Sequence, residues 1–137
     1  MLLLAFGTLL ISCTKTPTKA DLQYLSGYWE IEQVTFPNGE TRDFPPSTTT
    51  VDFYHLEDGK GLLKKVQPEI NGRFSVNAAA ITLSVLEREN HIVLLFNSQD
   101  NGWEETLEVL NEDRLETRHE NGLQYRYHRY EPFEILE

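Results

Sequence analysis

Apolar and polar residues alternate in short runs along most of the chain. Ile81, Leu83 and Val85 fall on one face of residues 80–86, and residues 91–96 repeat the pattern. Alternation with a period of two is typical of β-strands that bury one face. We therefore expect strands with one face toward a core, and a helical turn only at residues 21–25.

Clusters of Gly, Pro, Asn and Asp, such as Pro37-Asn38-Gly39, separate these runs and predict tight turns. The strands predicted between them span residues 28–36, 40–44, 48–56, 62–67, 73–76, 80–86, 91–96, 103–110, 114–118 and 123–130. Short strands at this spacing indicate an antiparallel barrel or a sandwich. Because the loops have hairpin length, we expect an all-β, up-and-down meander that closes into a barrel of about eight or more strands. Such a barrel either fills with side chains or holds one small ligand.

An uncharged apolar run covers residues 1–11 and ends at Leu10-Ile11-Ser12-Cys13. The run is too short to span a bilayer, which takes about 20 apolar residues, and has the length of a signal-peptide core. Its end resembles the bacterial lipobox. The resemblance implies that residues 1–12 are removed and that Cys13 is acylated. The alternative is a buried strand with an incidental free cysteine.

This division gives a signal peptide (1–12), a lipidated cysteine with a polar tether (13–20) and a β-barrel domain (21–137). The chain has 22 acidic and 12 basic residues, a net charge of −10. That balance argues against nucleic-acid binding and against electrostatic adhesion to anionic lipid. Membrane attachment would rest on the acyl chains of Cys13, the only cysteine.

Residues 25–31, with Gly27-Tyr28-Trp29, resemble the Gly-x-Trp opening strand of lipocalins and of the small lipocalin-like lipoproteins of Bacteroidetes. The final strand, 124–130, is similar to the Tyr/Arg-rich closing strand of those lipoproteins. The resemblance implies that Trp29 closes one end of the barrel and that Arg129 or Arg126 packs over it. It also implies a cell-envelope location.

Residues that could catalyse a reaction or bind a metal do not occur at the spacings that such sites require. No two of the four histidines, His55, His91, His119 and His128, share a strand at i, i+2. We expect no metal and no cofactor, and we place His119 in a solvated turn. The acidic residues of 104–112 follow no acid/base spacing, so we expect no catalytic residues and no enzyme.

Aromatic residues at alternating positions are the best candidates for a binding site. They either line an interior cavity or simply fill the core. This set consists of Trp29, Phe53, Phe74, Phe96, Tyr125 and Tyr127.

Three lysines, Lys60, Lys64 and Lys65, lie on one predicted hairpin of this acidic protein. Adjacent residues of a strand point to opposite faces, so Lys64 and Lys65 cannot both point the same way. We interpret the lysines as protection of an edge strand, with an anion site or a partner site as the alternative.

The sequence predicts a non-catalytic, membrane-anchored protein that binds a small hydrophobic or amphipathic ligand in its barrel. We expect it on the periplasmic face of an outer membrane, because the residues after Cys13 lack the acidic cluster that would resemble a surface-export signal of the Bacteroidetes. The alternative is a module with a filled core that binds an envelope protein through its loops. An exposed Trp103, beside the predicted loop 98–102, would favour that alternative.

Overall fold

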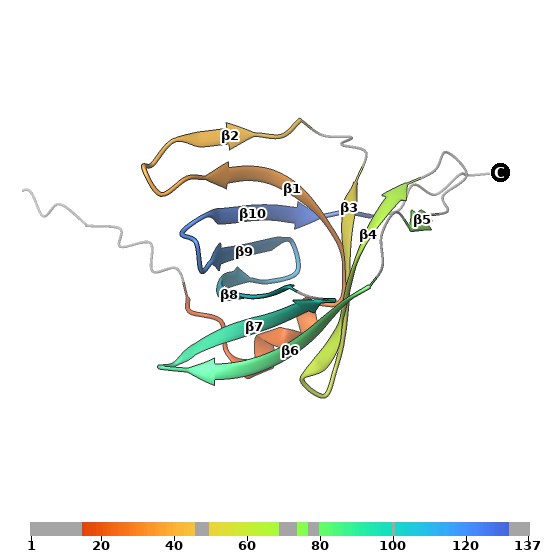
Figure 1. Cartoon of the computed structure of the whole chain (residues 1–137), viewed down its shortest axis with the longest axis vertical. Coiled ribbons are helices and arrows are strands. Elements are labelled where there is room, and N and C mark those ends of the chain that lie inside the picture. The colour runs from red at the N-terminus through yellow and green to blue at the C-terminus, as the bar shows by residue number, and fades with distance from the viewer. Residues whose placement is uncertain (1–14, 46–49, 69–73, 77–79, 100, 132–137) are drawn as a thin grey trace, which may run out of the picture.

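The structure is a computed structural model, and it describes residues 15–45, 50–68, 74–76, 80–99 and 101–131 (Figure 1). Residues 1–12 and Cys13 therefore lie outside the described residues. At positions 68 and 74–76 only the backbone is described.

In the part of the chain that the structure describes, a short 3-10 helix precedes ten antiparallel strands (Figure 1). The elements are η1 (Lys19–Tyr24), β1 (Gly27–Thr35), β2 (Thr41–Asp43), β3 (Val51–Glu57), β4 (Lys60–Pro68), β5 (Phe74–Val76), β6 (Ile81–Arg88), β7 (His91–Ser98), β8 (Asn101–Leu110), β9 (Arg114–His119) and β10 (Gln124–Arg129). Each predicted strand is present, and its bounds agree with the prediction to within a few residues.

Pairing between the first and last long strands closes the sheet into a barrel. Strands β1, β3, β4, β6, β7, β8, β9 and β10 each pair with the next, and β10 pairs back with β1. The short strands β2 and β5 pair with β1 and β4 outside this circuit. The expected all-β, antiparallel up-and-down barrel is confirmed, and the alternative of a sandwich is wrong.

A two-residue turn sets the register between β3 and β4. Asp58 and Gly59 both have positive φ, at 51° and 76°, the conformation that right-twisted hairpins favour. Counting outward from this turn pairs Asp52 with Lys65 and Tyr54 with Leu63. Paired residues of antiparallel strands share a face, so these four side chains point into the barrel together with the core.

The inward face of the strands forms one hydrophobic core. Its buried members are Leu25, Trp29, Tyr54, Leu63, Leu83, Ile92, Leu94, Phe96, Leu107, Leu110, Leu115 and Tyr127. Helix η1, drawn in orange in Figure 1, lies against β8 and adds Leu22 and Tyr24 to the edge of this core. A helical turn was expected at 21–25, and it begins slightly earlier, at Lys19.

Within the expected polar tether of residues 13–20, Pro17 is buried and Lys19 already belongs to η1. Two other local expectations are wrong. Most of the predicted loop 98–102 is strand, since Ser98 ends β7 and Asn101 begins β8. Strand β4 is no edge, because it lies between β3 and β6, so its lysines do not protect an edge.

Candidate functional site

The barrel interior contains a cavity of about 270 Å3, just below the range of about 300–1,000 Å3 that is typical of small-molecule pockets. It is lined by Asp52, Tyr54, Leu63, Lys65, Ile81, Trp103, Glu105, His119, Tyr125 and Tyr127. Eight of these ten side chains, all except Leu63 and Ile81, are aromatic or carry an ionisable group. The cavity wall is therefore mostly polar and aromatic.

An ion pair forms part of the cavity wall. Lys65 Nζ lies 2.6 Å from Asp52 Oδ1, and the two side chains are 42% and 9% exposed. Burial raises the pKa of the Asp52 carboxyl above its usual value, and the neighbouring Lys65 ammonium opposes that rise. A buried carboxylate is costly unless it is paired, which explains why these two residues lie opposite each other across β3 and β4.

Glu105 on β8 is a second buried carboxyl group in the cavity, at 8% exposure. Its two oxygens accept hydrogen bonds from Trp103 Nε1, at 2.8 Å, and from Thr117 Oγ1, at 2.7 Å. No lysine or arginine of the described part of the chain forms an ion pair with it. Neutral donors alone therefore hold this carboxyl group in place.

Tyrosines carry the remaining polar groups of the cavity. Burial raises the pKa of Tyr54 and of Tyr127 well above the usual value, and the negative charge of Glu105 adds to both shifts. Burial and Glu105 also raise the pKa of Tyr125. All three phenols thus stay neutral at physiological pH and present hydroxyl groups that can donate and accept hydrogen bonds.

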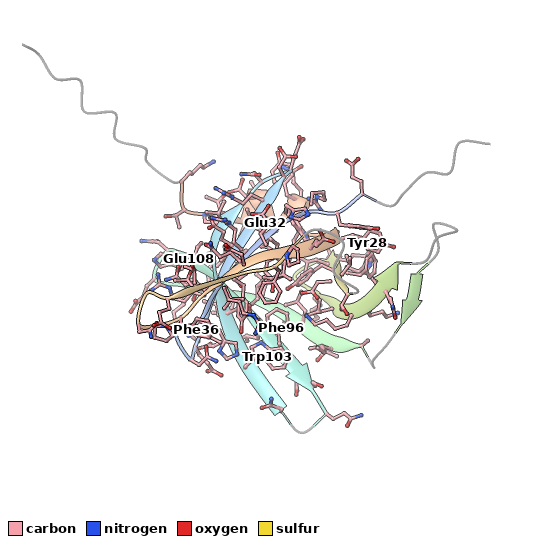
Figure 2. All side chains as sticks on the ribbon, turned by 90° about the horizontal axis from the view of Figure 1, so that it is seen from above. Tyr28, Glu32, Phe36, Phe96, Trp103 and Glu108 are labelled. Atoms are coloured by element: carbon pink, nitrogen blue, oxygen red, sulfur yellow. The ribbon has the colours of Figure 1, made fainter. Side chains whose placement is uncertain are left out.

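Trp103 lies within a row of stacked rings. The centroid of its ring is 5.2 Å from that of Phe96 and 6.4 Å from that of His119, with nearly parallel planes. Figure 2 shows Trp103 and Phe96 together at the centre of the molecule. Trp103 is half-buried and lines the cavity, so the exposed loop tryptophan that would favour a protein-interaction module is not observed.

Arg129 covers Trp29 where the first and last strands of the barrel meet. The guanidinium carbon lies 3.8 Å from the centroid of the indole, which is fully buried. Arg129 donates hydrogen bonds to the carbonyl oxygens of Tyr24, Ser26 and Glu112. Tyr125 lies at the start of β10 and Arg129 at its end, whereas Asp52 of the cavity wall pairs with Trp29 across β1 and β3, so the cavity extends from the start of β10 toward this closure.

The structure brings together only some of the predicted site residues. Tyr125 and Tyr127 line the cavity, and Phe96 is buried in the core beside it. Phe53 is on the outer face, where its ring packs on Tyr28 at 4.8 Å, so its assignment to the cavity is wrong. The side chain of Phe74 and the acylation site Cys13 lie outside the described residues.

The error at Phe53 has a physical reason. Residues 51–56 alternate ambiguously, and the more apolar choice places Phe53 inside. The observed register turns Asp52 and Tyr54 inward instead, because a one-residue shift exchanges the faces of a strand. The Asp58-Gly59 signal of a two-residue turn would have given this register and would have exposed the pairing of Asp52 with Lys65.

Arg126, the alternative to Arg129 as the residue that packs over Trp29, lies on the outer face. Its Nε is 3.1 Å from Glu32, whose other oxygen is 3.0 Å from His128 Nδ1. His128 Nε2 is 2.9 Å from Glu30.

His119 is not in a solvated turn but ends β9 and lines the cavity. Among the residues that the structure describes, no three His, Cys, Asp or Glu side chains are placed to hold a metal ion.

A larger hollow of about 890 Å3 crosses β4, β6, β7 and β8. It is lined partly by outward-facing residues such as Ser84 and Glu104 and is open to solvent. It has no buried charged group, so the interior cavity is the better candidate site.

In the described ranges, no helix is both long and apolar enough to cross a membrane.

No family model and no curated protein matches this chain in sequence. Among solved structures, a lipocalin-like protein from Bacteroides uniformis ATCC 8492 is similar, with a TM-score of 0.48 and 12% sequence identity. The match covers 77% of this chain and 98% of that protein.

Proposed function

We propose that this protein is a non-catalytic carrier that holds one small amphipathic molecule in its barrel. The observation that carries the proposal is the interior cavity of about 270 Å3. Its wall combines aromatic rings with the fully or largely buried polar residues Asp52, Glu105 and Tyr54. Buried polar groups of this kind are costly in a barrel that only needs a filled core, and they are the usual means of orienting a ligand.

The size of the cavity limits the ligand. A volume just below the ordinary range suits a molecule with one ring or a short chain rather than a long acyl chain. One part of the ligand would contact apolar residues such as Leu63 and Ile81, and the other would meet the polar groups.

Native mass spectrometry of the protein purified from the cells that produce it tests this proposal. We expect a stoichiometric adduct that disappears on denaturation. Ile81→Trp, which fills the cavity from the start of β6, should abolish the adduct. Thr82→Trp adds the same side chain to the next residue, which is exposed, and should retain it. A bare mass for the unmodified protein would contradict the proposal.

The location follows from the N-terminal sequence. Acylation of Cys13 would attach the carrier to the membrane, and the lack of an acidic, export-signal-like cluster after Cys13 supports the periplasmic face of an outer membrane. Each buried methylene of an acyl chain contributes about 0.8 kcal/mol to membrane binding. Cys13→Ser should abolish incorporation of labelled fatty acid and should release the protein from the membrane fraction. Unchanged fractionation would contradict lipid anchoring.

A further inference from the structure

The described residues that line the cavity do not balance one another in charge. Asp52 and Lys65 neutralise each other at 2.6 Å, whereas Glu105 has only the neutral donors Trp103 and Thr117. One negative charge therefore remains without a cation. Because the Glu105 side chain is buried, this charge acts over a lower dielectric than it would on the surface.

His119 does not supply the missing positive charge. Its Nδ1 accepts a hydrogen bond from the backbone N–H of Asn121, at 3.0 Å. A ring nitrogen that accepts a hydrogen bond carries no proton, so the imidazole is held in a neutral form. The cavity wall of the described residues thus keeps its excess negative charge with His119 in this arrangement.

The rings around Glu105 suit a cation as well. Trp103, Tyr125 and Tyr127 all border the same cavity as Glu105. The face of an aromatic ring attracts a cation, most strongly when the cation is desolvated. Burial, and to a lesser degree the charge of Glu105, raise the pKa of Tyr54 and Tyr127, which agrees with a negative potential inside the cavity.

We propose that the cavity binds a small organic cation, an amine attached to an aromatic or apolar group, with Glu105 as its counter-charge. This inference rests on the proposed carrier function and specifies its ligand class. The ammonium would lie near Glu105 and the tyrosine hydroxyls, and the apolar part would contact Leu63 and Ile81.

The same geometry disfavours anionic amphiphiles such as fatty acids. Lys65 is the only lysine or arginine among the described lining residues, and Asp52 already pairs with it. A carboxylate ligand would have to break that pair or lie near Glu105. Its binding would therefore carry a desolvation cost with no free cation to offset it.

A series of three compounds of similar shape and different charge tests the inference. Phenylethylamine, phenylethanol and phenylacetate are titrated separately into the full chain, with calorimetry as the readout. We expect the amine to bind roughly ten to thirty times more tightly than the alcohol, the increment of a desolvated cation–π contact with a counter-charge. Phenylacetate should bind most weakly.

Glu105→Gln should reduce the preference for the amine over the alcohol by about tenfold. Glu104→Gln is the matched control, because the neighbouring side chain points outward and pairs with Arg88, and it should leave the preference unchanged. The compound series on the unmodified protein does not depend on whether Glu105→Gln folds.

Equal or tighter binding of phenylethanol or phenylacetate would overturn the assignment of a cation and would leave the carrier function standing. Failure of all three compounds to bind would also overturn it. The native-mass measurement judges the carrier function separately, so the two failures are distinguishable.

Discussion

The guanidinium of Arg129 lies over the indole of Trp29, 3.8 Å from the ring centroid, and ties the last strand of the barrel to its first. Trp29 Nε1 donates to the carbonyl oxygen of Leu25, so both residues also hold the chain that enters β1. Trp29→Ala should lower the free energy of unfolding by about 3–5 kcal/mol, because a large buried side chain is replaced by a cavity.

Arg129→Met tests the other half of this contact. It removes the cation over Trp29 and leaves the carbonyl oxygens of Tyr24, Ser26 and Glu112 without their donor. We expect a loss of about 2–4 kcal/mol in urea unfolding. Arg126→Met is the control, since Arg126 is on the outer face, paired with Glu32, and it should cost less than about 1 kcal/mol. Equal losses for the two variants would contradict the assignment.

Gly27 leaves room for the same arginine. A Cβ at this position would lie 2.7 Å from Arg129 Nη1, and the backbone φ is +127°. Both facts disfavour any side chain, so Gly27→Ala should lower the free energy of unfolding by about 1–3 kcal/mol. The double variant Gly27→Ala with Arg129→Met should lose less than the sum of the two single losses. Additive losses would show that the close approach is unimportant.

Lys65→Met should destabilise the protein in a pH-dependent way. Burial raises the pKa of Asp52, and Lys65 opposes that rise. A carboxyl group whose pKa is higher in the folded state favours folding at low pH and loses that contribution as the pH rises above about 4. Without Lys65 the pKa rises further.

We therefore expect Lys65→Met to cost about 1–3 kcal/mol at pH 7, a range reduced because Lys65 is 42% exposed, and clearly less at pH 4. Urea unfolding at the two pH values measures the difference. Lys64→Met, the neighbouring residue on the outer face, should show no such dependence. A loss of equal size at both pH values would be the contrary result.

Tyr54 and Tyr127 should make the protein sensitive to alkaline pH. Because the pKa of each phenol is raised in the folded state, the stability they contribute is complete below about pH 10 and decreases as the pH rises further. Each such group changes the slope by at most about 1.4 kcal/mol per pH unit. Tyr54→Phe should make the loss of stability above pH 10 less steep in denaturant titrations, and an unchanged slope would argue against its burial.

The architecture could be predicted because alternation and turn residues are local signals. The strands at 81–88 and 91–98 follow from the regular spacing of Leu83, Val85 and Leu94, and hairpin-length loops leave a meander as the simple solution. The pairing of β1 with β10, which closes the barrel, could be expected but could not be read from a local pattern, since pairing between distant segments has no local signature.

The cavity could not be predicted from hydrophobicity alone. A pattern that scores polar residues as outward places Asp52, Lys65 and Glu105 on the surface, although each faces the interior. Their burial depends on partners from other strands, such as Thr117 on β9 for Glu105. A register shift in β8 between Leu107 and Val109 also interrupts the alternation near this site.

The two tryptophans of the chain allow the most direct test of ligand binding inside the barrel. Trp103 borders the cavity, whereas Trp29 is sealed beneath Arg129, so their indole N–H signals in a proton–nitrogen NMR spectrum report on different places. The small molecules released by denaturing the natively purified protein are added back to ligand-free protein. We expect the Trp103 indole signal to move and the Trp29 signal to stay in place. A bound molecule that leaves the Trp103 signal unmoved would contradict binding inside the barrel.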